Sequence, residues 1–467
     1  MATGTYPPRR RKRRRPDTSV FWFILFNILL LAGLVFLILW GFDLMPGNDA
    51  TEPSATMDSF QTDGTTLPSE TTTPPTTEPP PTEPHVTSTA SIGVTGDIMG
   101  HMPVINAGWT GTGYDFNSVF AYVKPYYEKY DLMIANLEVN LGGPEGGPYQ
   151  GYPTFNCPDD MAVALKNAGV DMVLTANNHT YDIGHKGFMR TQQVLEDLGI
   201  DHLGTVSSTE TPLYQVRDIN GIKVGMVCYT YETGDPSNPR KQLNGIGVDL
   251  EDTPLVGSFN YNDLDGFYTE LQQAMDAMEA EGAEATMVYL HWGDEYVLKP
   301  NNRQVTIATQ LCEMGVDVIV GGHPHVIEPF EMLTSSTGHK TYCIYSTGNA
   351  ISNQRKDTVS NLTVNSNYTE DGMIFNVVFE KWTDGTVKVG EIDILPTWVN
   401  KEFKNGKNNY TIIPLDVTLD SWDGFDVGIV ANTYNSYART MSIVGDGLNA
   451  CRESLELPAV PLTKTAD

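Results

Sequence analysis

The residues in this sequence that could do chemistry fall in six short polar motifs. Each motif follows an apolar run and supplies aspartate, glutamate, asparagine or histidine. In chain order the motifs are Gly96-Asp97; Asn136-Leu137-Glu138; Asn177-Asn178-His179, with Asp182 nearby; His291-Trp292, with Glu295 and Tyr296; His323-Pro324-His325; and Gly348-Asn349. Carboxylate, imidazole and amide groups bind hard or borderline divalent metals, and these motifs contain no cysteine. The residue types therefore predict a site for zinc, manganese or iron.

The number of candidate ligands is large enough for two divalent ions. Two metals about 3.5–4 Å apart can activate a water molecule and stabilise an in-line displacement at phosphorus. Glycines beside the motifs allow tight turns and a close approach of the backbone to an anion. The chemistry that this pattern predicts is metal-dependent hydrolysis or group transfer.

The apolar runs before the motifs are the elements that must position them. Candidate strands lie at Ser91–Gly96, Leu132–Asn136, Met172–Ala176, Lys223–Tyr229, Ala285–Leu290, Val316–Val320 and Tyr342–Tyr345. Candidate helices lie between them at Asp159–Ala168, Lys186–Leu198, Leu264–Glu281 and Arg303–Met314. Strands that alternate with helices indicate a layered α/β fold. Because the carboxyl ends of strands in such a sheet converge on one crevice, the six motifs are expected to meet there.

Segments on either side of this region have other patterns. Alternating segments at Gly372–Glu380 and Thr386–Ile394 predict antiparallel strands that complete a sandwich, followed by an extension at 399–467 with no evident role. Residues 43–90 are rich in threonine, proline, serine and glutamate, which predicts an extended linker without a packed core.

The N-terminus has the features of a membrane anchor. Residues 20–42 are apolar and uncharged, long enough to cross a hydrocarbon core of about 30 Å. All residues from Arg9 to Arg15 are basic, which places the tail at 1–19 in the cytoplasm and the rest outside. A cleaved signal peptide is the alternative, although the apolar run is longer than such peptides usually have. We expect a retained single-pass helix.

The charge of the chain excludes one class of partner. Seven of the 29 basic residues lie at 9–15, so 22 remain against 58 acidic residues, a formal charge of about -36 for the rest. So acidic a domain repels phosphate backbones, and no nucleic-acid binding is expected. Five scattered cysteines form no CxxC pair and indicate neither a zinc knuckle nor a disulfide framework.

The six motifs, in this order, resemble those of the CapA family of poly-γ-glutamate capsule proteins. The resemblance runs from about residue 91 to 350, with a tail to about 398. It implies a metallophosphatase-like layered β-sandwich flanked by helices, similar to the calcineurin-like metallophosphoesterases. It also implies a role in the synthesis, export or surface retention of poly-γ-glutamate. The expected divisions are 1–19, the tail; 20–42, the membrane helix; 43–90, the linker; 91–398, the CapA-like domain; and 399–467, the extension.

The resemblance also implies roles for single residues. His179 would protonate a leaving group, and Asp182 is grouped with it as catalytic. Metal binding is expected of Asp97, Glu138, Asn178, His291, His323 and His325. Contact with substrate is expected of Asn136, Asn177, Trp292, Glu295, Tyr296 and Asn349. Trp292 and Tyr296 have packing as an alternative role.

Two positions depart from the phosphoesterase pattern. Where those enzymes have a histidine two residues after the first aspartate, this chain has Met99, and His101 comes two residues later. Their bridging aspartate has no direct counterpart, so either Glu138 or Asn136 would take its place. One of the two metal positions is therefore expected to be weakened.

Three functions are compatible with these features. The first is a membrane-anchored hydrolase or transferase that acts outside the cytoplasm on an anionic capsule polymer such as poly-γ-glutamate. The second is a non-catalytic subunit that holds the polymer within a membrane synthase complex. The third is a general surface metallophosphoesterase, which predicts turnover of small phosphomonoesters.

Overall fold

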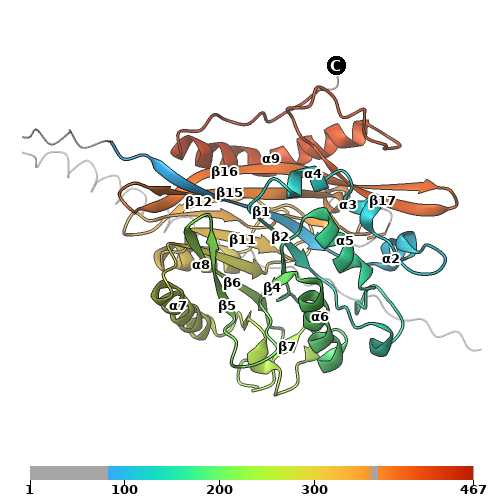
Figure 1. The fold of residues 1–467 in the computed structure, drawn as a ribbon, viewed down its shortest axis with the longest axis horizontal. Coiled ribbons are helices and arrows are strands. Elements are labelled where there is room, and N and C mark those ends of the chain that lie inside the picture. The colour runs from blue at the N-terminus through green and yellow to red at the C-terminus, as the bar shows by residue number, and fades with distance from the viewer. Residues whose placement is uncertain (1–82, 357, 360–365, 466–467) are drawn as a thin grey trace, which may run out of the picture. The chain divides into compact units, whose positions relative to one another are not determined.

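The computed structural model describes residues 83–356, 358–359 and 366–465 (Figure 1). These residues belong to one compact unit, Pro80–Asp467. The predicted basic tail, the predicted membrane helix at 20–42 and nearly all of the predicted linker lie outside the described residues. Within the described residues, no helix has the length and apolar character needed to span a membrane.

The larger of the two main sheets has eight strands. Their bounds are Val86–Ile98 (β1), Leu132–Leu137 (β2), Met172–Leu174 (β3), Asp201–Leu203 (β4), Asn349–Ile351 (β14), Asp371–Trp382 (β15), Val387–Lys404 (β16) and Lys407–Pro414 (β17). The order is β17-β16-β15-β1-β2-β3-β4, and β14 also pairs with β1. Strands β1 to β4 and β14 are parallel, whereas β15, β16 and β17 pair antiparallel. The predicted antiparallel strands are therefore confirmed.

The second sheet has a parallel centre and antiparallel edges. Its strands are Tyr214–Ile219 (β5), Ile222–Tyr231 (β6), Ser258–Phe259 (β9), Ala285–His291 (β10), Val318–Gly322 (β11), Phe330–Thr334 (β12) and Lys340–Ile344 (β13). The order is β12-β13-β11-β10-β6-β5, with β9 paired to β6. A short hairpin of Gln242–Leu243 (β7) and Ile246–Gly247 (β8) lies apart from both sheets.

The two sheets pack face to face, and helices cover their outer sides (Figure 1). Alternation along β2 explains this arrangement, because Ile134 faces the core between the sheets while Met133 and Ala135 face the helices. Helices on the larger sheet are Met102–Gly108 (α2), Asn117–Phe120 (α3), Lys124–Tyr127 (α4), Asp160–Ala168 (α5) and Gly184–Leu198 (α6). Those on the second sheet are Leu264–Ala280 (α7) and Asn302–Glu313 (α8). The predicted layered α/β fold is confirmed.

The C-terminal helix, Ala431–Ser454 (α9), belongs to the same core. Its residues Tyr437 and Met441 are buried in the cluster formed between the sheets. Gly447 lets α9 approach β12 closely, because a Cβ there would lie 1.9 Å from the carbonyl oxygen of Phe330. The expected division at 398/399 falls inside β16, so the extension continues a strand of the domain.

Local sequence signals explain where the helices begin and end. Asn301 and Gln304 form a capping box at the start of α8. Gly169 ends α5 with a φ of 94°, a conformation that favours glycine. The four predicted helices and the predicted strands all occur, most of them within a few residues of the expected bounds, although β1 begins five residues earlier and β16 ends ten residues later than expected. All five cysteines are free and buried.

Candidate metal centre

The carboxyl ends of the central strands from both sheets meet at one place, as the sequence predicts. Asp97 lies near the end of β1, in register with Asn136 of β2 and Asn349 of β14. In the second sheet His291 ends β10 beside Gly322, the last residue of β11. The chain then supplies Glu138 directly after β2 and His323 directly after β11. The main polar motifs are thereby brought together from segments more than 200 residues apart.

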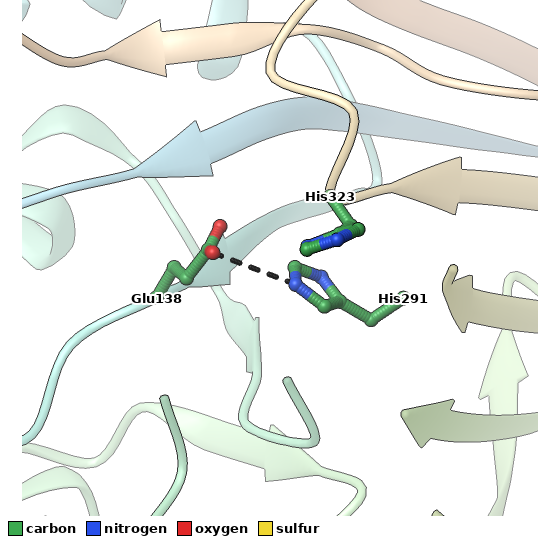
Figure 2. Close-up of side chains that lie close together, drawn as sticks. All are labelled: Glu138, His291 and His323. Carbon is green, nitrogen blue, oxygen red and sulfur yellow. Dashed lines mark ion pairs between the residues drawn. The ribbon is translucent and has the colours of Figure 1, made fainter. Parts of the chain in front are cut away.

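Glu138 lies at the middle of the cluster. Its Oε1 is 3.4 Å from Nε2 of His291 and 3.7 Å from Nε2 of His325. Figure 2 shows the Glu138 carboxylate pointing toward the His291 ring, with the His323 ring next to it and tilted by 59°. The ring centroids of His291 and His323 are 4.9 Å apart. All four side chains are buried.

Two overlapping groups of ligand atoms share this carboxylate. Asp97, Glu138 and His325 form one group, and Glu138, His291 and His323 form the other, each with its atoms within 4.8 Å of one another. Asn178 Oδ1 lies 2.9 Å from His291 Nε2 and so adds an amide oxygen to the second group. A third group joins exposed Glu295 to His323 and His325. Of the two candidates for the bridging residue, Glu138 is the one in a bridging position.

Unpaired polar atoms show that these residues fit a cation. Glu138 Oε1 and His323 Nδ1 are buried and have no hydrogen-bond partner among the residues that the structure describes. A buried polar atom without a partner costs roughly 1–3 kcal/mol, and more when the group is charged. A divalent cation in contact with carboxylate oxygen and imidazole nitrogen would remove that cost. The donor set, imidazole and carboxylate with one amide, suits zinc, manganese or iron.

The electrostatics of the two groups differ. Burial lowers the pKa of His325, but the charge of Glu138 and a 3.0 Å contact with Asp97 outweigh burial and raise the pKa to about 9. Burial alone would raise the pKa of Asp97, yet the hydrogen bond and charge of His325 lower it. His323 has the opposite behaviour to His325, because burial and the neighbouring histidines hold its pKa well below the usual value. A negative field therefore surrounds His325 in particular.

The backbone is strained at His323 and His325. His323 has a φ of 95° and His325 a φ of 54°, in the left-handed region that non-glycine residues rarely adopt. Such strain persists only where surrounding contacts enforce it, and it is concentrated at functional sites. Asn349 supplies one of these contacts, since its Nδ2 donates to the carbonyl oxygen of His325 at 3.1 Å.

The predicted catalytic pair forms at the side of the metal cluster. His179 Nδ1 lies 2.7 Å from Asp182 Oδ2, which also accepts the backbone N–H of Phe155 at 2.6 Å. With a proton on Nδ1, His179 donates a hydrogen bond to Asp182, which fixes the orientation of the ring. Burial raises the pKa of Asp182, although His179 opposes this effect. The ring of Phe155 packs edge-on against that of His179.

The predicted asparagines form the framework behind the candidate metal ligands. Asn136 Nδ2 donates to Asp97 Oδ1 at 2.7 Å, so Asn136 orients a ligand. Asn177 donates to the Leu137 carbonyl and accepts the backbone N–H of His179, which joins the end of β2 to the catalytic pair. Together with Asn349, these residues are all buried. Their predicted contact with substrate stays a prediction.

The aromatic candidates have different positions. Trp292 is fully buried, and its indole N–H donates to the Tyr345 carbonyl at 2.9 Å, so it is a packing residue. Tyr296 is half-buried, its ring centroid lies 6.0 Å from that of His325, and its hydroxyl accepts a hydrogen bond from Gln354. Glu295 is exposed beside Tyr296. Glu295 and Tyr296 are thus accessible to solvent, at least in part, whereas Trp292 is not, and their contact with substrate stays a prediction.

Three further residues at the site were not predicted. Tyr231 lies 4.9 Å from the His323 ring, and its place at the end of β6 was a usable signal. Phe155 lies between the rings of His179 and His101. His101 accepts the backbone N–H of Asn353 at Nδ1, and burial lowers its pKa to about 3. Met99 is buried in the core beneath the helices, so it supplies nothing to the cluster.

Comparison with known proteins bears on this site. A family model described as bacterial capsule synthesis protein PGA_cap matches residues 91–354, more than half of the chain and all six polar motifs. The chain is 27% identical over 247 residues to the capsule biosynthesis protein CapA of Bacillus anthracis, a match that covers 52% of this chain and 55% of that protein. It is 25% identical over 249 residues to the PGA biosynthesis protein CapA of Bacillus subtilis, covering 51% and 57% respectively. Each match therefore spans about half of the relative's length.

Two solved structures illustrate the similarity of this chain to known folds. The NAD nucleotidase NadN of Haemophilus influenzae is 13% identical with a TM-score of 0.39, covering 78% of this chain and 67% of that one. The calcineurin-like phosphoesterase YfkN of Bacillus subtilis is 16% identical with a TM-score of 0.35, covering 78% and 99%. The family match, by contrast, includes every strand end that builds the cluster. The chain belongs to the bacterial capsule synthesis protein PGA_cap family.

Proposed function

We propose that this chain is a membrane-anchored protein of capsule-polymer biosynthesis or export, with a metal-dependent hydrolase or transferase site. The observation that carries the proposal is the buried Oε1 of Glu138. This atom is shared by two groups of ligand residues and has no hydrogen-bond partner among the described residues. A carboxylate in such a position suits a bridge between two cations.

Two cations would be held by overlapping sets of side chains. Asp97, Glu138 and His325 would hold the first, and Glu138, Asn178, His291 and His323 would hold the second. Bound there, the cations would act as Lewis acids that activate water and neutralise charge on the reacting group. The buried walls around the ligands strengthen every electrostatic interaction at the site.

His179 and Asp182 would supply the proton that the leaving group needs. With its Nδ1–H held by Asp182, His179 presents Nε2 as the nitrogen that can give a proton to a leaving group. The Phe155 N–H, which also donates to Asp182, keeps that carboxylate in place. Asn177 fixes the His179 backbone relative to the end of β2. The pair is therefore oriented from both sides.

We propose an anionic polymer such as poly-γ-glutamate as the substrate or cargo, and membrane synthase subunits as partners. The family of the chain and the names of its two CapA relatives support this proposal. A domain with so many acidic residues repels a polyanion, so bound cations would offer the polymer its point of attachment. The basic cluster and the apolar run at 20–42 support a helix that leaves the domain outside the cell.

Metal analysis of the full chain in detergent tests the site directly. Wild type is compared with the His291→Ala/His323→Ala double variant by elemental analysis and by release of product from phosphomonoesters, phosphodiesters and poly-γ-glutamate. We expect wild type to bind zinc, manganese or iron, and the double variant to lose the ion of the His291–His323 group together with the turnover that depends on it. Metal and polymer binding without turnover would favour the polymer-holding subunit. Turnover of phosphomonoesters alone would favour the general phosphoesterase.

A second experiment tests the topology and the cellular role. Protease added to intact cells should release the domain if it lies outside. A strain carrying the double variant should lose surface polymer while the protein still reaches the membrane. Normal polymer with the double variant would contradict the proposed function.

A further inference from the structure

The C-terminal helix α9 lies outside the family-matched residues, yet one buried ion pair joins it to the larger sheet. Arg439 donates from Nε and Nη2 to the two carboxylate oxygens of Asp371, at 2.7 and 2.6 Å. Ser436, also on α9, donates to the same carboxylate at 2.6 Å. Asp371 is 1% exposed. A two-pronged arginine–carboxylate pair fixes geometry as well as charge, so α9 sets the position of Asp371.

Asp371 is the first residue of β15, at the point where this strand meets the segment behind the metal centre. Gly348 pairs with Gly372 there. The contact is tight, because a Cβ on Gly348 would lie 2.6 Å from the Asp371 carbonyl oxygen. Two residues before Asp371, the carbonyl of Thr369 lies 3.0 Å from Asn349 Nδ2. A shift of Asp371 therefore moves the backbone around Asn349.

Asn349 contacts the metal centre on two sides. Its Nδ2 is 3.1 Å from the carbonyl oxygen of His325, and its backbone pairs with Asp97 in register. His325 needs such support because its φ of 54° is unfavourable for an L-residue. The contacts thus run from α9 through Asp371 and Asn349 to two of the three ligands in the Asp97 group.

We propose that α9 is a positioning element for the metal centre. The Arg439–Asp371 pair holds the first residues of β15, these hold Asn349, and Asn349 holds His325 where it can bind metal. Arg439 is therefore a positioning residue that sets the affinity of the Asp97–Glu138–His325 group for a divalent cation. The inference rests on the proposed metal site and gives the C-terminal extension a role in it.

The other end of α9 supplies a matched control. Arg452 donates to the carbonyl oxygens of Pro458 and Ile392 and lies 3.3 Å from Asp393. Asp393 pairs with Asn376, five residues after Asp371 and therefore about 17 Å further along β15. Arg452 is 7% exposed, so its replacement should destabilise the same helix. Its side chain makes its hydrogen bonds and ion pair away from the segment behind the site.

The test compares Arg439→Met with Arg452→Met in the full chain, stripped of metal and titrated with Zn²⁺ against a competing chelator. Titrations are done well below the unfolding temperature of each variant. We expect affinity at one of two sites to fall about tenfold in Arg439→Met, as for other residues that support metal ligands, and to change less than twofold in Arg452→Met. Asn349→Ala should reproduce the loss, and Arg439→Lys provides a milder change if Arg439→Met does not fold.

Two results would overturn the inference, and they differ from each other. Equal affinities in Arg439→Met and Arg452→Met, with wild type binding zinc, would show that α9 acts only through stability, and the proposed function would stand. Wild type that folds but binds no zinc would remove the proposed function and this inference together.

Discussion

The two halves of the candidate metal centre differ in the number of candidate ligands that they contain. The half around His291 and His323 has an amide ligand, Asn178, in addition to the shared Glu138. In the half around Asp97 and His325, the shared Glu138 is the only other buried ligand residue grouped with them among the described residues. Met99 faces the core, His101 is hydrogen-bonded to the Asn353 backbone, and Glu295, which is grouped with His323 and His325, is exposed. Four protein ligands against three indicates unequal affinities. The two candidate groups therefore differ in how many ligands they could offer a cation.

The largest effect is expected from the residue that the halves share. Glu138→Gln keeps the size of the side chain but removes its charge, so both cations should be lost and turnover should fall at least about 100-fold. Elemental analysis and initial rates measure the two effects. Retention of both metals in Glu138→Gln would show that the carboxylate is no bridge.

Single histidine variants sharpen the comparison between the halves. His291→Ala should abolish the tighter zinc site, whereas His325→Ala should abolish only the weaker one and leave about one equivalent of zinc bound. The physical reason is the extra amide ligand beside His291. Zinc titration against a chelator separates the two sites. Identical losses in the two variants would mean that the halves do not differ.

The smallest effect concerns the pH dependence of the metal-free protein. The pKa of His325 is raised from its usual 6.5 to about 9, so its stabilising contribution is complete below pH 6.5 and is lost as the pH rises through 9. A shift of this size corresponds to roughly 3 kcal/mol. His323, whose pKa is lowered, contributes in the opposite sense and destabilises the fold as the pH falls below 6.5.

Urea unfolding of chelator-treated protein at pH 5, 7 and 9 measures these contributions. His325→Asn should remove the loss of stability at alkaline pH, and His323→Asn the loss at acid pH. The same pH profile in both variants would contradict the opposite electrostatic environments of the two halves.

The sequence predicted the layered fold and the meeting of the polar motifs because both follow from local patterns. Apolar runs marked β1, β2, β10 and β11, and parallel strands place their carboxyl ends together. It also predicted that Glu138 would take the bridging place, with Asn136 as the alternative. Their distinct roles depend on the directions of their side chains. These two residues are only two positions apart, at the end of β2.

What the sequence could not supply depends on distant contacts. The packing role of Trp292 is set by the carbonyl of Tyr345, and the burial of Met99 by helices on the outer face. The extension at 399–467 showed no pattern that indicated a role, because α9 derives its position from contacts with β12 and β16. Nothing in the sequence around Arg439 or Asp371 indicates that these two residues form a buried ion pair.

The pairing of β1 with β15 sets the order in which this protein can fold. Thr95 pairs with Ile374, which comes 279 positions later in the chain. A contact of such long range forms slowly, because the intervening chain must first be brought together. Until residue 382 has been made, the strand that carries Asp97 has an open edge, the kind of surface that aggregates. The family-matched segment 91–354, produced alone, should therefore fail to fold, since it lacks the strand that closes its own central sheet.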